Sequence, residues 1–212
     1  MNLIVLGPPA SGKGTQAELL AEKFGLYHLQ TGEVARHLAE HDARIKEMVD
    51  SGKLIPEEEM TMYVMDFLHT IKPDLKNILF EGYPRFISQY DALEKFLKSK
   101  NEEIDAVIFL DISQEETIKR MSSRRICDAC GKSYSLITNP PKTDGVCDDC
   151  GGKLIHRPDD VPDAIKVRFQ YYQDNTKKLI DYLNGKDKLI KIDGTRPIDA
   201  IFSDILKKLE AK

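Results

Sequence analysis

The chain has 212 residues, of which 41% are hydrophobic and 31% charged, and its formal net charge is −4. This length suffices for one α/β core with a small accessory module, and the composition is that of an ordinary globular protein. The mildly acidic balance excludes a global attraction to nucleic acid or to an anionic membrane, so we expect neither as a partner. Any anion must be bound by local clusters of Arg and Lys.

The N-terminal residues do not indicate export. Met1 leads directly into a short apolar run that ends at Gly7, and this run is shorter than the core of a signal peptide. No apolar stretch approaches the roughly 20 residues that cross a bilayer. We therefore expect a cytoplasmic protein.

Short apolar runs alternate with stretches of helical periodicity, which predicts a parallel sheet covered by helices. The predicted strands are Asn2–Leu6, Tyr27–Leu29, Ile78–Glu81, Ala106–Ile112 and Lys188–Ile192. Continuous apolar runs of this kind are typical of strands that are buried on both faces.

Three of the predicted helices have recognisable ends. Ser113 and Glu116 form a capping-box pattern, which opens a helix that runs to residue 124 or 125. Pro162 begins a long helix whose apolar residues recur at spacings of three and four, with Gly185 as the expected C-cap. Pro197 begins the last helix.

Two stretches do not fit the alternation of strands and helices. Residues 30–59 predict two short helices without a strand between them. Residues 126–161 are rich in Gly, Pro, Cys and Asp and have no helical pattern. We interpret both stretches as insertions into the core.

A Gly-rich loop, Gly-Pro-Pro-Ala-Ser-Gly-Lys-Gly-Thr at residues 7–15, follows the first predicted strand and precedes a helix. This is the Gly-x4-Gly-Lys pattern of a phosphate-binding loop. Gly12 and Gly14 let backbone N–H groups turn toward phosphate oxygens, and the helix N-terminus adds partial positive charge. Lys13 supplies a full charge near the transferring phosphate, and Thr15 offers a hydroxyl near Mg²⁺. The alternative, an ordinary Gly-rich turn, is disfavoured by the strand–loop–helix context.

Several segments, in order along nearly the whole chain, resemble the adenylate kinases and related nucleoside-monophosphate kinases. They are Gly-Lys-Gly-Thr-Gln at 12–16, Thr-Gly-Glu-Val-Ala-Arg at 31–36, Glu-Gly-Tyr-Pro-Arg at 81–85 with Gln89, and Arg120, Arg124, Arg157-Pro-Asp-Asp and Arg168. The resemblance implies the α/β P-loop kinase fold, in which helices flank a five-stranded parallel sheet. It divides the chain into a core at 1–29, 60–122 and 162–212, a helical AMP-binding insertion at 30–59 and a zinc-binding lid at 123–161.

The resemblance also implies reversible phosphoryl transfer from Mg-ATP to AMP, giving two ADP, and it assigns roles. The expected ATP-binding residues are Gly12, Lys13, Gly14, Thr15, Arg120 and Arg124. The expected AMP-binding residues are Thr31, Arg36, Ile55, Gly82, Arg85, Gln89, Arg157 and Arg168. The expected catalytic residues are Lys13, Arg85, Arg124, Arg157 and Arg168. Glu33 and Glu81, both Asp in the family pattern, are expected near Mg²⁺, and Asp159 and Asp160 are expected to hold the lid closed.

The positions of the arginines also indicate anion binding independently of the family resemblance. Arg120 and Arg124 are spaced i,i+4, so we expect them on one helix face. Arg168 lies beside an apolar stripe and needs an anion, yet few carboxylates are evident as partners. Each arginine alone is equally compatible with a surface residue. His28, in a short apolar strand, is interpreted as a core residue.

The four cysteines form two Cys-x2-Cys pairs, Cys127 with Cys130 and Cys147 with Cys150, separated by sixteen residues. This spacing predicts a tetrahedral zinc site, and the glycine after each pair permits the required turn. Four thiolates leave no open position, so we expect one structural Zn²⁺ per chain. Two disulfides are an alternative. A nucleic-acid-binding ribbon is disfavoured, because residues 132–146 contain only two lysines and one aromatic side chain.

Two other functions stay open. The first keeps the fold and changes the acceptor to CMP, UMP or GMP, although Thr31 and Gln89 resemble the AMP-specific pattern. The second is a non-catalytic nucleotide-binding or zinc-ribbon protein, which would not require the six phosphate-facing arginines found here. One core with a complete site needs no partner subunit, so we expect a monomer that binds ATP, AMP and ADP.

Overall fold

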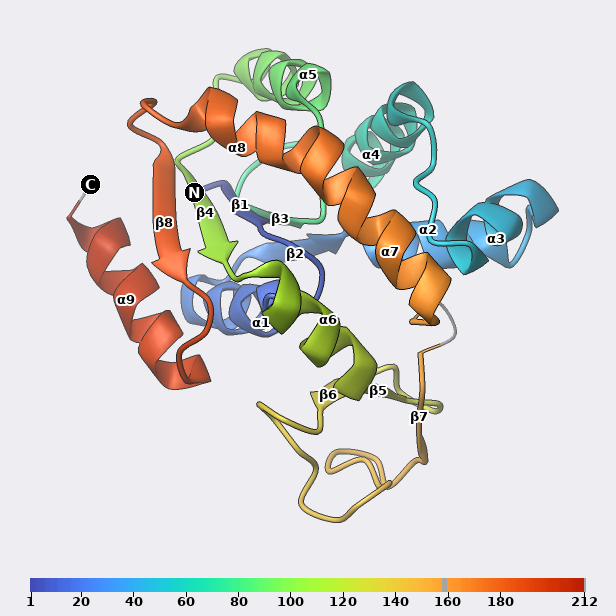
Figure 1. Cartoon of the computed structure of the whole chain (residues 1–212). Coiled ribbons are helices and arrows are strands. Elements are labelled where there is room, and N and C mark those ends of the chain that lie inside the picture. Colours follow the sequence, from blue (N-terminus) through green and yellow to red (C-terminus); the bar gives the residue numbers. More distant parts are fainter. Residues whose placement is uncertain (158–159, 212) are drawn as a thin grey trace.

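The structure, a computed structural model, describes residues 1–157 and 160–211 (Figure 1). The predicted site residue Asp159 and the side chain of Glu33 lie outside the described part. The described residues form a five-stranded parallel sheet with helices on both faces and a second, three-stranded antiparallel sheet. In Figure 1 the second sheet lies at the bottom, away from the main sheet.

All five predicted strands are confirmed in the main sheet. They are β1 (Leu3–Leu6), β2 (Tyr27–Gln30), β3 (Ile78–Glu81), β4 (Ala106–Asp111) and β8 (Leu189–Asp193). Their spatial order is β2-β3-β1-β4-β8, which places the strand before the Gly-rich loop in the centre. The carboxyl ends of parallel strands share one edge, so the loop after β1 lies beside the ends of β3 and β4.

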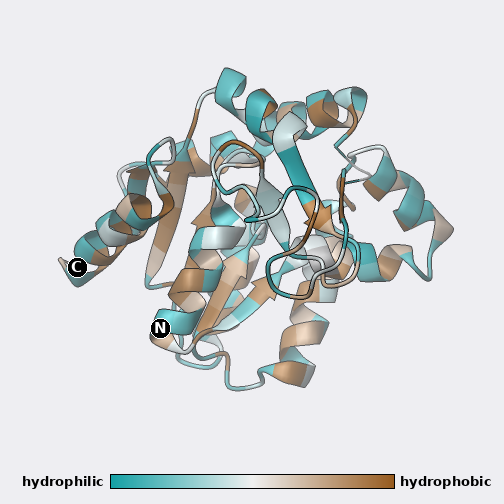
Figure 2. Ribbon diagram, turned by 90° about the horizontal axis from the view of Figure 1, so that it is seen from below, coloured by the Kyte–Doolittle hydropathy of each residue, from teal (hydrophilic) through white to brown (hydrophobic). Residues whose placement is uncertain are grey.

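Helices cover both faces of this sheet. One face packs against α1 (Lys13–Phe24) and α9 (Ile198–Glu210), and the other against α4 (Glu57–Ile71), α5 (Ile87–Lys98) and α8 (Lys177–Leu183). Figure 2 shows the reason, because the strands are mostly hydrophobic while the helices alternate between hydrophobic and hydrophilic residues. In β1, Leu3 and Val5 contact one layer and Ile4 and Leu6 the other, so every strand position must be apolar.

The helix predicted after Ser113 is α6 (Gln114–Ser123), and it ends before Arg124. Ser113 Oγ accepts from the Glu116 N–H at 3.1 Å, which confirms the N-cap. Arg124 begins β5 (Arg124–Cys127) instead of ending the helix. The prediction that Arg120 and Arg124 share a helix face is therefore wrong, because the chain turns into the second sheet between them.

The long helix predicted from Pro162 is interrupted. It consists of α7 (Pro162–Tyr171), a π-helical segment η1 (Tyr172–Thr176) and α8. The helix ends at Leu183, and Asn184 rather than Gly185 is its cap residue. Gly185 follows with φ of 101°, so the left-handed turn that glycine permits lies at the predicted residue, one position beyond the observed cap.

The two stretches outside the alternating pattern differ from each other. Residues 30–59 contain the expected short helices, α2 (Thr31–Ala39) and α3 (Ala43–Asp50), before α4 begins. Between Arg124 and Ile155 lie β5, β6 (Ser133–Ser135) and β7 (Leu154–Ile155), paired in the order β6-β5-β7. The division of the chain into core, insertion and lid stays a prediction. Within the described ranges, no helix is long and apolar enough to span a bilayer.

Candidate active site and metal centre

The loop after β1 is shaped by close packing of its backbone. A Cβ at Gly7 would lie 2.5 Å from Ser11 Oγ and 2.6 Å from the Leu110 carbonyl oxygen, so only glycine fits there. Gly12 has φ of 93°, which glycine adopts without strain, and it immediately precedes α1. The first N–H groups of α1 have no partners within the helix, and together with the helix dipole they favour an anion at this loop.

Ser11 is a candidate residue that the sequence analysis did not single out. It is fully buried, and its Oγ has no hydrogen-bond partner among the residues that the structure describes. A buried polar atom without a partner costs about 1–3 kcal/mol. The loop therefore fits a ligand that brings its own polar atoms.

The side chain of Lys13 folds back over the loop. Its Nζ donates to the carbonyl oxygens of Gly7 at 3.0 Å and Pro8 at 2.6 Å. Burial lowers the pKa of Lys13 to about 7, because it removes the ammonium from water. An anion at the loop would restore the charged form, since opposite charge favours ionisation.

Four further charged groups act on Lys13. Glu81 raises its pKa, while Arg85, Arg124 and Arg168 lower it. These effects require proximity, so residues from the start of α1, from the end of β3 and the loop after it, from β5 and from α7 converge on one point. Such a concentration of cations favours a polyanion such as a nucleotide phosphate.

The other predicted arginines lie around the same space. Arg120 is buried and its Nε donates to Glu116 Oε1 at 2.6 Å. Burial lowers the pKa of Arg85, and the charge of Arg157 adds to that lowering. Arg36 and Arg157 line the same large cleft as Arg120.

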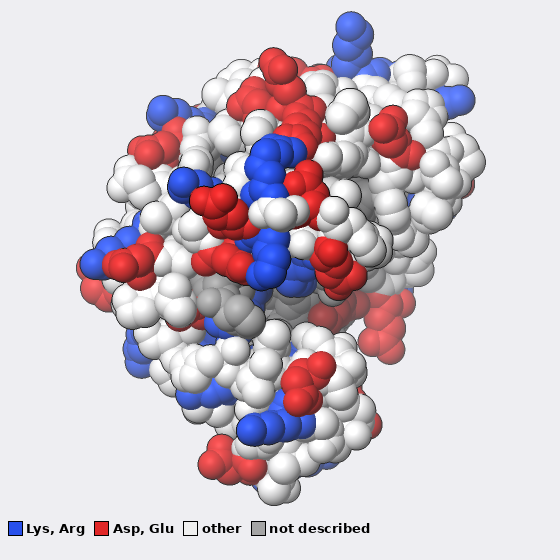
Figure 3. Space-filling view, turned by 90° about the vertical axis from the view of Figure 1, so that its right-hand side faces the viewer, with Lys and Arg blue, Asp and Glu red and all other residues white. Residues whose placement is uncertain are grey.

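This cleft has a volume of about 1580 Å³. Its lining includes residues 12–15, Glu81 and all six predicted phosphate-facing arginines, and β6 of the second sheet contributes residues from the opposite side. Figure 3 shows Lys and Arg atoms beside the hollow that separates the segment at the bottom from the main body. The second sheet therefore forms one wall of the cleft.

Asp160 connects two of the arginines. Its buried carboxylate accepts from Arg124 Nε at 2.6 Å and Nη2 at 2.5 Å, and from Arg168 Nη1 at 2.8 Å. The expectation that Arg168 has few carboxylate partners is therefore wrong. Asp160 is brought to Arg124 from 36 positions further along the chain, so no local pattern predicts the contact.

Glu81 is held by a histidine that the sequence analysis assigned to the core. His28 Nε2 lies 3.1 Å from Glu81 Oε2, and Gln30 Nε2 lies 3.4 Å from His28 Nδ1. Burial by itself raises the pKa of Glu81, but the His28 hydrogen bond and the Lys13 charge outweigh it, so the net pKa is below its ordinary value. A Cβ at Gly14 would lie 3.6 Å from Glu81 Oε1, which places this carboxylate beside the phosphate-binding loop.

A smaller pocket of about 60 Å³ adjoins the cleft. Five of the predicted AMP-binding residues line it: Thr31, Ile55, Gly82, Arg85 and Gln89. A Cβ at Gly82 would lie 2.9 Å from Thr31 Oγ1, and the φ of this glycine is +76°, so both space and backbone require glycine.

Gln89 also holds the wall of this pocket together. Its Oε1 accepts from the Arg85 N–H at 2.9 Å, and its Nε2 donates to the Glu57 carbonyl oxygen at 3.1 Å. Arg85 Nε in turn donates to the Gly82 carbonyl oxygen at 2.7 Å. The amide thus joins the loop after β3 to the first turn of α4.

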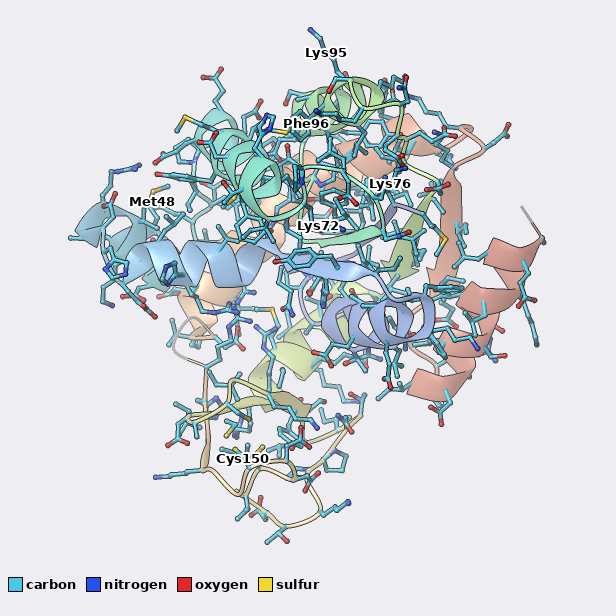
Figure 4. The ribbon with its side chains drawn as sticks, turned by 180° about the vertical axis from the view of Figure 1, so that it is seen from behind. Met48, Lys72, Lys76, Lys95, Phe96 and Cys150 are labelled. Carbon is cyan, nitrogen blue, oxygen red and sulfur yellow. The ribbon has the colours of Figure 1, made fainter. Side chains whose placement is uncertain are left out.

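The four cysteines converge beside the second sheet, where Cys127 ends β5 and the other three lie in turns, and Figure 4 labels Cys150 there. All four Sγ atoms lie within 4.8 Å of one another, with Cys127 and Cys150 at 3.4 Å and Cys130 and Cys147 at 3.7 Å. The cysteines are free, so the alternative of two disulfides is wrong. Tetrahedral zinc with Zn–S bonds of about 2.3 Å requires sulfurs about 3.8 Å apart, and this donor set fits it.

Each cysteine pair forms the same backbone turn. Gly131 and Gly151 have φ of 75° and 72°, and their N–H groups donate to the carbonyl oxygens of Cys127 and Cys147. The glycine predicted after each pair is therefore confirmed as a conformational requirement. Gly152 is needed for space, because a Cβ there would lie 2.7 Å from Cys127 Sγ.

A phosphate-binding loop at the carboxyl edge of a parallel sheet, with converging cations, defines a P-loop nucleotide-binding protein. The family model described as adenylate kinase matches residues 5–188. The adenylate kinase of Methanothrix thermoacetophila is 42% identical over 214 aligned residues, covering 99% of this chain and 98% of its own. Those of Archaeoglobus fulgidus and Clostridium novyi are 41% and 39% identical, each covering 99% of this chain and 98% and 99% of their own. The chain belongs to the adenylate kinase family.

Proposed function

We propose that this protein catalyses the reversible transfer of a phosphoryl group from Mg-ATP to AMP, giving two ADP. The observation that carries the proposal is the convergence of Lys13 with Arg85, Arg124 and Arg168 in a cleft that adjoins a second, smaller pocket. The large cleft, at about 1580 Å³, has room for two nucleotides, and its cations suit the phosphates between them. The adenylate kinase relatives support the choice of ATP and AMP.

In this proposal the loop holds the ATP phosphates through its amides and Lys13, with Arg120 and Arg124 closing over them. The residues that would bind AMP are Thr31, Arg36, Ile55, Gly82, Arg85, Gln89, Arg157 and Arg168. The residues that would act in catalysis are Lys13, Arg85, Arg124, Arg157 and Arg168. An AMP phosphate oxygen is already anionic, so the transfer requires positioning and charge stabilisation rather than a general base.

Mg²⁺ is proposed to enter with ATP. Glu81 fits a role beside it, because the carboxylate lies next to the loop and its lowered pKa keeps it ionised. Carboxylate oxygens and waters are the ligands that Mg²⁺ prefers. Glu33 is proposed for the same role, and the Thr15 hydroxyl lines the same cleft. The bound ion would supply charge neutralisation between the phosphates.

The segments 30–59 and 123–161 are proposed to close over AMP and ATP, with Asp159 and Asp160 holding the closed lid. Structural Zn²⁺ on the four cysteines would supply the folding energy that this small segment lacks. We infer a cytoplasmic monomer that acts on nucleotides and has no nucleic-acid or membrane partner.

The test is ADP formation from Mg-ATP with AMP, CMP, UMP and GMP supplied separately under identical conditions. AMP should be preferred by orders of magnitude. Preference for another monophosphate would retain the phosphate site and reject the assignment of the small pocket. ATP binding without turnover on any acceptor would reject the enzyme and favour a nucleotide-binding protein. A folded Lys13→Ala variant should lose activity.

A further inference from the structure

His37, Glu40 and His41 form a second group of metal-ligating side chains, separate from the cysteines and from the proposed catalytic residues. Their ligand atoms all lie within 4.8 Å of one another. His37 Nδ1 lies 3.6 Å from Glu40 Oε2, and the imidazole rings of His37 and His41 are 5.3 Å apart at 83°. Two imidazoles and one carboxylate therefore face a common point on the surface.

The backbone keeps these side chains in register. His37 belongs to the last turn of α2. Glu40 is the C-cap residue of this helix and still has helical backbone angles (φ −69°, ψ −22°). The N–H groups of His41 and Asp42 both donate to the Leu38 carbonyl oxygen at 3.0 Å, so the helical turn continues past the end of α2. An i,i+4 pair on such a turn projects from one face, with Cβ atoms about 5–6 Å apart.

We propose that His37, Glu40 and His41 bind one divalent transition metal ion, of the class that includes Zn²⁺, Ni²⁺ and Cu²⁺. Imidazole nitrogen selects these ions over Mg²⁺ and Ca²⁺, which take oxygen ligands. Paired histidines at i,i+4 on a helix are a recurrent zinc-binding arrangement, and the Glu40 carboxylate adds a third ligand atom within reach of both. The site has three protein ligands, which leaves coordination positions for water or an external ligand.

Exposure and charge both favour binding of the ion. The His37 and Glu40 side chains are 73% and 68% exposed, so binding requires little desolvation and the rings are free to rotate toward bonds of about 2.0–2.1 Å. The C-terminal end of α2 carries partial negative charge, which adds to the attraction of a cation. A simple His37–Glu40 ion pair at such exposure contributes little by itself.

The proposed metal site lies at the border of the large cleft. His37 and Glu40 both line the rim of the large cleft, next to the proposed AMP-phosphate ligand Arg36. In Figure 1, α2 and α3 extend together to the right of the main sheet. The three proposed ligands are distinct from the residues proposed for catalysis, so binding of the ion does not depend on the proposed function.

The test is calorimetric titration of Ni²⁺ into the untagged protein with its cysteine site already loaded with zinc. The wild type should bind one Ni²⁺ beyond the zinc. His37→Ala and His41→Ala should weaken that binding by about 10- to 100-fold or more, the range produced by losing even the hydrogen-bond partner of a ligand. Glu40→Gln should weaken it less. The matched control is His69→Ala, a surface histidine on α4 that packs against Phe96 and should leave binding unchanged.

Two measurements identify the site. Zinc that stays with the protein after the titration, measured by elemental analysis of the desalted sample, should remain at one per chain, which separates this site from the cysteines. Paramagnetic broadening of amide signals should centre on residues 37–42. The proposal is overturned if the wild type shows no saturable Ni²⁺ binding, or if the double variant His37→Ala/His41→Ala binds Ni²⁺ as tightly as the wild type.

Discussion

Nucleotide binding should be coupled to proton uptake by Lys13. Burial lowers the pKa of this lysine from 10.5 to about 7 in the nucleotide-free protein, with three arginines adding to the effect. A nucleotide phosphate beside the ammonium supplies the missing negative charge and should raise the pKa again. Because the lysine is charged in the complex and partly neutral before it, the protein must take up a proton when the nucleotide binds.

The size of the effect follows from the pKa of Lys13. With a pKa of about 7, the fraction of protonated lysine is about one half at pH 7 and about 0.1 at pH 8. Full protonation in the complex then requires an uptake of about 0.9 proton per ATP at pH 8 and about 0.1 at pH 6. Affinity should fall with rising pH, by about fivefold between pH 7 and pH 8, because the charged form becomes scarce.

The assay is calorimetry of Mg-ATP binding at pH 8 in buffers that differ in ionisation enthalpy. The slope of the observed binding enthalpy against the buffer ionisation enthalpy gives the number of protons taken up per ATP. ATP itself contributes little at this pH, because the second pKa of a phosphate is near 6. Lys13→Arg should abolish the uptake, since the guanidinium is always protonated. Lys178→Met removes an exposed lysine of α8 and should leave the uptake unchanged.

Two results would refute this reasoning. An uptake below about 0.3 proton at pH 8 would mean that Lys13 is already charged in the nucleotide-free protein. An equal uptake in the Lys13→Arg variant would assign the proton to another group. Either result would also remove the physical basis for the predicted pH dependence of affinity.

Three further perturbations test the metal centre, the carboxylate beside the loop and the core. Cys147→Ser should disorder residues 124–155 while leaving the main sheet folded, which amide NMR signals would report; an unchanged spectrum would contradict a structural metal. His28→Ala removes a charge-assisted hydrogen bond to Glu81 worth about 1.5–3 kcal/mol, so kcat and the Mg²⁺ dependence of the rate should change more than the KM for AMP. Ile108→Ala opens a cavity at a fully buried position in β4 and should cost about 2–5 kcal/mol, lowering the calorimetric midpoint by about 4–20 °C.

The parts of the fold that the sequence predicted are those with a local physical signal. The strands are continuous apolar runs because both faces of the main sheet are covered, so their positions could be read directly. The phosphate-binding loop and the cysteine pairs depend on glycines at fixed offsets, and the backbone angles of Gly12, Gly131 and Gly151 explain why. In each case the cause and the pattern lie within a few residues of each other.

The parts that could not be predicted depend on tertiary contacts. The π-helical segment 172–176 has only five residues, too few for its different hydrogen-bond period to show as a pattern in the sequence. The strands of the second sheet are two to four residues long, too short for an alternating pattern to emerge. His28 reaches Glu81 across 53 positions, so its role beside the site depends on the pairing of β2 with β3.

Asp160 shows how such a contact prepares the cleft. Three charge-assisted hydrogen bonds from Arg124 and Arg168 satisfy a buried carboxylate, and the carboxylate keeps two guanidinium groups in place that would otherwise repel each other. A phosphate that enters the cleft therefore meets cations whose charge is already partly compensated. The net binding free energy is the difference between the contacts that the arginines make with phosphate and those that they already make with Asp160. This difference is smaller than either contribution alone. A moderate binding free energy favours release of product after each turnover. Tighter binding of the ground-state nucleotide would not lower the barrier of the transfer, because only contacts that are stronger in the transition state do so.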